Sequence, residues 1–155
     1  MMVYRVCHID EMELLLNGNF KDVGKSYSRV LMKDTNTHDY KPGVKYMHFF
    51  DRLESILYLR RLTGFYLCYY DIPEGILEEG KGIGYYLDLA LFRTYNPVNE
   101  FAIPTSDLSM DYLVKIDRID GRIDLDDYLE NPDLSRFMNE MYVKDSDNRL
   151  VKKIK

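Results

Sequence analysis

An arginine in an otherwise apolar segment is the first candidate for chemistry. Arg5 lies within residues 2–7, whose β-branched and aromatic side chains predict a short strand. A guanidinium in such a strand needs either an anionic partner or a place at the edge of the sheet. The segment therefore indicates an anion-binding strand or an ordinary edge strand.

A second candidate site combines polar loop residues with the aromatic strand that follows them. The hydrogen-bonding side chains of the loop are Asn36, Thr37 and His38. Tyr46 and His48 lie on the strand predicted over residues 43–50. Aromatic walls with a few hydrogen-bonding groups are the usual composition of a small-molecule cleft. The alternative is a tyrosine-rich strand with ordinary alternation, in which Tyr46, His48 and Phe50 share one face.

A glutamate before a short strand is the third candidate. Glu100 leads into the apolar strand predicted over residues 101–104. Taken alone, a glutamate in such a place is usually solvated. The three segments together are more informative than any one of them.

Common catalytic signatures are absent from the sequence. It contains no nucleophile elbow, no His-Glu-x-x-His motif and no Cys-x-x-Cys motif. His8, His38 and His48 have no spacing that requires a metal, so no metal site is predicted. Residues 81–84 contain two glycines, but these are not followed by the lysine and hydroxyl residue that complete a phosphate-binding loop, so we expect a turn there.

Two early helices are predicted from their capping residues. The first begins at Asp10, has Glu13 in the capping-box position and ends at Gly18. The second follows Asp51 and ends near Gly64. These helices would hold the first and second candidate segments in place.

Strands and the end of the chain complete the expected fold. Strands are predicted over residues 2–7, 43–50, 65–72, 85–92, 101–104 and 112–116, with a short one near 28–32. The strand over 65–72 is a nearly continuous aromatic run, so we expect it to be central. Residues 19–42 and 73–84 are expected to be a long loop and a turn-rich segment. Asn131 and Pro132 predict a terminal helix that runs to about Tyr142, followed by a loose charged end.

The order of these elements predicts one α+β domain over residues 1–155 with a mixed or antiparallel sheet, because regular β-α-β alternation is missing. Its core is expected over residues 3–116, with the terminal helix and charged tail over 117–155. The chain is 46% hydrophobic, enough for a core without metal or disulfide support.

Charge and hydropathy limit the partners and the location. A net charge of −5 is not the broad basic field expected of a protein that binds duplex nucleic acid through many phosphates. We see no signal peptide and no apolar run of about 20 residues, so membrane insertion is not expected. Cys7 and Cys68 lie in apolar runs and are expected to be buried thiols in a cytoplasmic protein.

The order of the candidate segments resembles the ADP-ribosyltransferase superfamily. Tyr4-Arg5 and the helix at residues 10–18 are similar to the family's opening strand and helix. Residues 46–58 are similar to its second strand and the helix that follows. Residues 100–104 and 112–116 are similar to a late pair of strands, the first of which begins with the catalytic glutamate. The resemblance covers residues 3–116 and consists of the order of short motifs.

Two details refine the resemblance. His8-Ile9-Asp10, with the later Glu-Phe-Ala-Ile-Pro, is similar to the branch that contains the DNA-modifying toxins of toxin–antitoxin systems. The chain lacks the Ser-Thr-Ser triplet after the second strand, and Val98 stands where a second acidic residue or glutamine would precede Glu100. These departures speak against the arginine-modifying branch.

The resemblance implies an ADP-ribosyltransferase-like split sheet and an enzyme that uses NAD as a substrate, as a toxin or defence effector. It implies that Glu100 stabilises the oxocarbenium-like ribose and that Arg5 binds the pyrophosphate or adjacent ribose, with His8 as a competitor for that contact. The implied NAD contacts are Tyr4, His8, Asn36, Thr37, His38, Tyr46 and His48.

Other functions stay open. One is RNA 2′-phosphotransferase chemistry, which also passes through NAD. Another is a non-catalytic α+β module that binds a protein through its tyrosine-rich cleft. The macromolecular acceptor can be protein, DNA or RNA, and an antitoxin or other protein partner is possible at the terminal helix or basic tail.

Overall fold

The computed structural model describes residues 1–19, 25–26, 41, 43–53, 66–81, 85–86, 97–119 and 125–153. The strands are β1 (Met2–Cys7), β2 (Lys25–Ser26), β3 (Lys45–Phe50), β4 (Tyr66–Asp71), β5 (Tyr85–Tyr86), β6 (Pro97–Val98), β7 (Glu100–Pro104), β8 (Leu113–Ile119), β9 (Met138–Lys144) and β10 (Leu150–Lys152). The helices are α1 (Ile9–Leu16), α3 (Glu74–Gly80) and α5 (Leu125–Glu130), with single-turn 3₁₀ helices η2 (Thr105–Asp107), η3 (Met110–Tyr112) and η4 (Leu134–Phe137).

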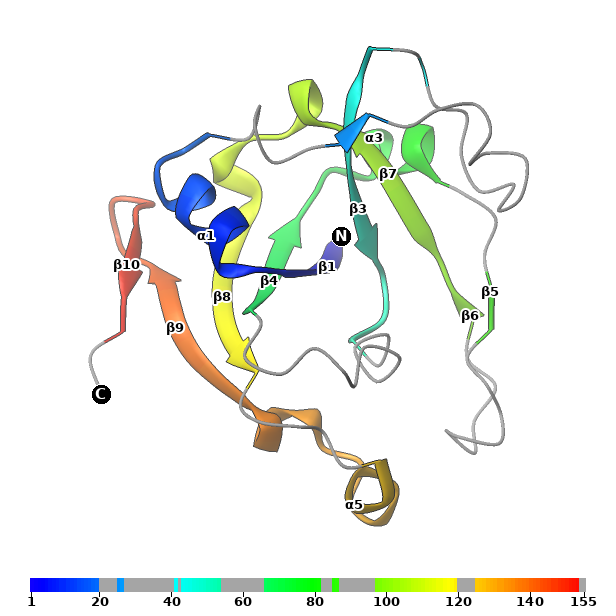
Figure 1. The fold of residues 1–155 in the computed structure, drawn as a ribbon, viewed down its shortest axis with the longest axis vertical. Coiled ribbons are helices and arrows are strands. Elements are labelled where there is room, and N and C mark those ends of the chain that lie inside the picture. Colours follow the sequence, from blue (N-terminus) through cyan, green and yellow to red (C-terminus); the bar gives the residue numbers. More distant parts are fainter. Residues whose placement is uncertain are drawn as a thin grey trace.

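An antiparallel sheet of eight strands is the centre of the fold, which confirms the α+β class (Figure 1). The strand order is β10-β9-β8-β4-β1-β3-β2, and β7 also pairs with β3. The predicted central strand is confirmed, because β4 lies between β1 and β8. Strands β5 and β6 form a separate small ladder.

The sheet is nearly divided between β1 and β3. These two strands pair at one register position, where Tyr4 lies opposite Phe50. By contrast, β1 pairs with β4 at six positions and β3 with β7 at five. We call the Tyr4–Phe50 position the junction. On one side of it lie β10, β9, β8, β4 and β1; on the other lie β3, β2 and β7, and β3 and β7 run side by side in Figure 1.

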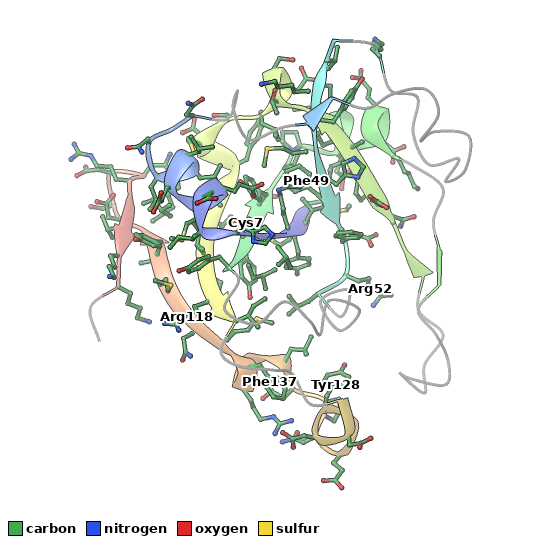
Figure 2. All side chains as sticks on the ribbon, viewed as in Figure 1. Cys7, Phe49, Arg52, Arg118, Tyr128 and Phe137 are labelled. Atoms are coloured by element: carbon green, nitrogen blue, oxygen red, sulfur yellow. The ribbon has the colours of Figure 1, made fainter. Side chains whose placement is uncertain are left out.

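Three hydrophobic clusters are found among the described residues, and the smallest consists of Tyr46 and Ala102 with Val44 packed against them. The main core contains buried residues of β1, β3, β4, β7 and β8 together with Met12 and Leu15 of α1 and Leu77 of α3. Figure 2 shows two of its members, Cys7 and Phe49, in the interior of the molecule. The second cluster contains Leu67, Ile119 and Leu134, with Tyr128 and Phe137 packed at the α5 end.

Helix α1 differs from its prediction at one end. It ends as predicted, because Gly18 has a φ of 72° and its N–H bonds the Leu15 carbonyl oxygen. The prediction that Asp10 caps the helix is wrong, since α1 begins at Ile9 and His8 occupies the N-cap position. Asp10 instead lies in the first turn, where a carboxylate interacts favourably with the helix dipole.

The predicted terminal helix from Asn131 to about Tyr142 is wrong. Helix α5 ends at Glu130, η4 follows, and residues 138–144 form β9, which pairs with β8 and β10. Pairing on both sides outweighs the local helix-start signal. The chain from β9 to Lys153 is not loose either, because β10 extends the ladder and the Lys153 N–H bonds the Met141 carbonyl oxygen.

The turn-rich segment predicted over residues 73–84 contains a helix, α3. Gly80 lets that helix approach β7 closely, because a Cβ atom there would lie 2.5 Å from the Ala102 carbonyl oxygen. Lys81 forms an isolated bridge with Phe101, and Gly82 to Gly84 lie outside the described residues.

Several expectations cannot be compared with the structure. The strand near residues 28–32, the body of the helix after Asp51 and most of the strand at 85–92 lie outside the described residues. Within the part of the chain that is described, no helix has the length and apolar character needed to cross a lipid bilayer.

Candidate functional site

Two predicted site residues on neighbouring strands meet beside the junction, and a third, Arg5, contacts the backbone of one of them. Glu100 Oε1 of β7 lies 2.5 Å from His48 Nδ1 of β3. Arg5 Nη1 of β1 donates a hydrogen bond of 3.1 Å to the His48 carbonyl oxygen. The side chains of His48 and Glu100 are 18% and 20% exposed. The pair is therefore held by the fold and still open to solvent at one side.

The pairing of β3 with β7 explains why His48 and Glu100 meet. In this register Phe50 lies opposite Glu100 and His48 lies opposite Ala102. Residues two apart on a strand share a face, so His48 and Glu100 are diagonal neighbours on the same face. The alternate residues of both strands, Met47, Phe49, Phe101 and Ile103, are buried in the main core.

Arg5 is fixed by Glu11 of α1. Its Nε donates to Glu11 Oε2 at 2.9 Å and its Nη2 donates to Glu11 Oε1 at 2.6 Å. The two side chains are only 17% and 14% exposed. Burial by itself would lower the pKa of Arg5, but the hydrogen bond and charge of Glu11 raise it above its ordinary value. Arg5 is therefore a permanent cation with an anionic partner. This confirms the first of the two alternatives, because β1 lies between β4 and β3 and is not an edge strand.

The third nitrogen of Arg5, Nη1, bonds β3 next to the position where the pairing of β1 with β3 ends. If the register of the junction continued, Val6 would lie opposite His48. The pairing of β1 with β3 is given only at Tyr4 and Phe50, and the His48 carbonyl oxygen accepts from Arg5 Nη1. Arg5 thus acts on the site through the His48 backbone, and its guanidinium already makes one hydrogen bond from each nitrogen.

A clamp between Asp51 and Asn99 adjoins Glu100. The Asp51 carboxylate accepts from the Asn99 N–H and from Asn99 Nδ2, each at 2.8 Å. The Asp51 N–H donates to the Asn99 carbonyl oxygen at 3.2 Å. Sequence reasoning gave Asp51 only as a helix cap and missed the clamp, because nothing local signals a pair 48 residues apart.

Of the other predicted contacts, Tyr4 lies at the junction and Tyr46 lies two residues before His48 on β3. Tyr46 is buried, and its hydroxyl oxygen accepts from the Lys41 N–H. Tyr4 lies opposite Phe50 and packs edge-on against Tyr69, with ring centroids 5.4 Å apart. His8 is exposed at the start of α1. Asn36, Thr37 and His38 lie outside the described residues.

A second polar network, not found from the sequence, lies on β4 and β8. Asp117 is 3% exposed and accepts a hydrogen bond of 2.7 Å from the Tyr69 hydroxyl. Lys115 Nζ lies 3.6 Å from the same carboxylate and 4.5 Å from the Tyr69 ring centroid. Burial, and then the Asp117 carboxylate, raise the pKa of Tyr69 well above its ordinary value. Tyr69 is therefore a stable hydrogen-bond donor at neutral pH.

The cysteines are buried free thiols, as predicted, with their sulfur atoms 3.6 Å apart. The hydrogen bond with Cys68, followed by burial, raises the pKa of Cys7, so Cys7 is a poor nucleophile at neutral pH. Across the described ranges, no three His, Cys, Asp or Glu side chains are grouped to hold a metal ion.

The site near the junction can therefore act through charge and hydrogen bonds. A carboxylate held by an imidazole can accept hydrogen bonds from hydroxyl groups and can stabilise a positive charge that develops nearby. Comparisons of this chain with protein-family models, with curated proteins and with solved structures find no significant match.

Proposed function

We propose that the chain is an NAD-dependent ADP-ribosyltransferase-like enzyme, with the site centred on Glu100 and His48. The observation that carries this proposal is the contact of His48 with Glu100 beside the junction, with Arg5 bound to the His48 carbonyl oxygen. These residues lie far apart in the sequence and come from the opening, second and late strands that the family resemblance singles out. The near division of the sheet between β1 and β3 also supports an ADP-ribosyltransferase-like fold.

In this proposal Glu100 acts on the ribose that carries nicotinamide. The bond between ribose C1′ and the nicotinamide nitrogen breaks, and its electron pair leaves with nicotinamide. The ribose becomes oxocarbenium-like, and the Glu100 carboxylate stabilises the positive charge and accepts hydrogen bonds from the ribose hydroxyls. A nucleophile of the acceptor then attacks C1′ and loses a proton.

His48 and Arg5 have supporting roles. With a proton on Nδ1, His48 donates to Glu100 and fixes the direction of the carboxylate. Arg5 holds the His48 backbone, and its own charge is matched by Glu11. A direct contact of Arg5 with the pyrophosphate would require Glu11 to give up at least one of its two hydrogen bonds. A role as toxin or defence effector is part of the proposal, with the acceptor left open.

Release of nicotinamide tests the proposal. Purified protein is incubated with NAD, with and without cell lysate, and free nicotinamide is followed by proton NMR. We expect Glu100→Gln to lower the rate about 10²–10³-fold, as removal of one oriented electrostatic group does elsewhere. The matched control is Glu130→Gln, which changes an exposed glutamate at the end of α5 and should leave the rate unchanged.

Two outcomes contradict the proposal. Full turnover by the Glu100→Gln protein would exclude Glu100 from the chemistry. Absence of nicotinamide release, together with no rise in melting temperature at millimolar NAD, would favour a binding module, because a ligand of the native state must stabilise it.

A further inference from the structure

We infer that Asp51 and Asn99 are positioning residues that hold Glu100 in its working geometry; the inference rests on the proposed function. Asp51 directly follows β3 and Asn99 directly precedes Glu100. Neither side chain needs to touch NAD for this role. They act on the reaction through the backbone that carries Glu100.

The clamp closes the β3–β7 ladder at the end where Glu100 lies. Continuing the register beyond Phe50 and Glu100 places Asp51 opposite Asn99. The last backbone bond of this ladder runs from the Asp51 N–H to the Asn99 carbonyl oxygen. Strand ends are the places where ladders open most easily. A catalytic carboxylate one residue from such an end needs an additional restraint.

The Asp51 carboxylate supplies that restraint with both of its oxygens. Oδ1 accepts from the Asn99 backbone N–H and Oδ2 accepts from the Asn99 side-chain amide. Hydrogen bonds to an ionised carboxylate are about twice as strong as bonds between neutral groups. Two such bonds from one carboxylate fix the orientation of Asn99 as well as its position, and Glu100 follows in the chain.

The clamp and Arg5 hold the catalytic pair from opposite directions. Arg5 holds His48 through its carbonyl oxygen, and the clamp holds Glu100 through the preceding residue. The 2.5 Å contact between His48 Nδ1 and Glu100 Oε1 depends on both. Catalytic groups need placement within about 0.5 Å, and a displacement of about 1 Å can lower a rate about 10²-fold.

The test weakens the clamp with single substitutions and then restores it in a double variant in which Asp and Asn exchange positions. Asp51→Asn removes the charge that strengthens both bonds, and the bond at Oδ2 can then form only between two neutral amides, after the Asn99 amide has turned over. We expect kcat for nicotinamide release to fall about 10²-fold, with KM for NAD changed less than twofold. Asn99→Ala removes only the side-chain bond and should give a smaller loss of kcat. In Asp51→Asn/Asn99→Asp an amide again faces a carboxylate, so kcat should recover to within about threefold of the wild type.

The imidazole resonances of His48 give a readout that does not need NAD. The histidine signals are followed by ¹⁵N–¹H NMR and assigned by replacing His8 and His38 in turn. We expect the His48 signals to shift in Asp51→Asn and to return in the exchanged pair, because they report the contact with Glu100. The matched control is Asp145→Asn, whose carboxylate also accepts two hydrogen bonds, from the Asp147 and Arg149 N–H groups, in the β9–β10 loop.

The outcomes separate this inference from the proposed function. Unchanged kcat and unchanged His48 signals in Asp51→Asn would overturn the inference. A loss of kcat that the exchanged pair does not restore would also overturn it. If the wild-type protein releases no nicotinamide, the proposed function fails, and the His48 signals still decide whether the clamp positions Glu100.

Discussion

Two adjacent tyrosines of β4 differ in whether their hydroxyl groups have a hydrogen-bond partner, which decides how each hydroxyl group affects stability. Tyr69 donates to the buried Asp117 carboxylate. The Tyr70 hydroxyl is fully buried and has no hydrogen-bond partner among the residues that the structure describes. Their side chains are on opposite faces, since Tyr69 packs against the second cluster and Tyr70 belongs to the main core. The pair is therefore a matched comparison within one strand.

We predict opposite effects of removing the two hydroxyl groups. Tyr69→Phe leaves the buried Asp117 carboxylate with fewer donors and should lower the free energy of unfolding by about 1–3 kcal/mol. Tyr70→Phe removes an unpaired buried hydroxyl and should leave that free energy unchanged or raise it. Urea unfolding at pH 7 measures both. Equal destabilisation by the two variants would contradict the assigned network.

The same comparison extends to alkaline pH. The folded pKa of Tyr69 is raised, so its contribution is complete below the unfolded pKa of about 10. Above that pH the unfolded state loses the proton first, and stability falls as pH rises towards the folded pKa. Tyr69→Phe removes the hydroxyl group and with it this pH-dependent contribution to the free energy of unfolding. Its free energy of unfolding should therefore fall less steeply than that of the wild type between about pH 9 and 11.

The contact between α3 and β7 is the element-scale feature closest to the site, because β7 begins with Glu100. A Cβ atom at Gly80 would lie 2.5 Å from the Ala102 carbonyl oxygen and 2.6 Å from Ile103 Cδ1. The first of these is a backbone atom, which cannot rotate away. The helix and the strand can approach this closely only with glycine at position 80.

We predict that Gly80→Ala lowers the free energy of unfolding by about 1–3 kcal/mol, because overpacking displaces α3 or β7. Gly75→Ala is the control in the same helix. Nothing lies within 4 Å of a Cβ atom there, so alanine should stabilise α3 through its helix propensity, by about 0.5–1 kcal/mol. Thermal unfolding of both variants checks the prediction, and a stabilised Gly80→Ala protein would contradict the close approach.

Local patterns predicted elements well where one face is buried. Alternation in residues 43–50 and the aromatic run in 65–72 gave β3 and β4, and Gly18 gave the end of α1. They failed for β9, where Asn131 and Pro132 imitate a helix start. The residues of β9 become a strand because β8 and β10 pair with both edges, and a local pattern does not contain its long-range partners.

The candidate site was predictable in its residue types and not in its contacts. Arg5 could be selected because a charged side chain is unusual in an apolar strand, and His48 and Glu100 from the composition of their segments and the order of the motifs. The Glu11 partner of Arg5 and the clamp between Asp51 and Asn99 depend on how α1, β1, β3 and β7 assemble. Those contacts become visible only when the register of the sheet is known.

At the scale of the whole molecule, the junction is a weak connection between two parts of the sheet. One register pair and the hydrogen bond from Arg5 to His48 join β1 to β3. The neighbouring pairs β1–β4 and β3–β7 are joined along most of their length. Regions with few backbone bonds open at a lower free energy than the rest. We therefore expect β3 and β7 to open together, before β4 and β8.

Glu11→Gln should increase the difference between the free energy needed to open β3 and β7 and the free energy needed to open β4 and β8. Glutamine keeps the length of the side chain and one acceptor oxygen, but Arg5 loses its anionic partner and its hold on the His48 carbonyl weakens. We predict a loss of about 1–3 kcal/mol in unfolding free energy and faster amide hydrogen exchange in β3 and β7, with β4 and β8 retaining most of their protection. Glu13→Gln, at an exposed position of the same helix, should change neither. A uniform loss of protection over all strands in Glu11→Gln would mean that the sheet opens as one unit, and that Arg5 stabilises the whole fold without acting specifically at the junction.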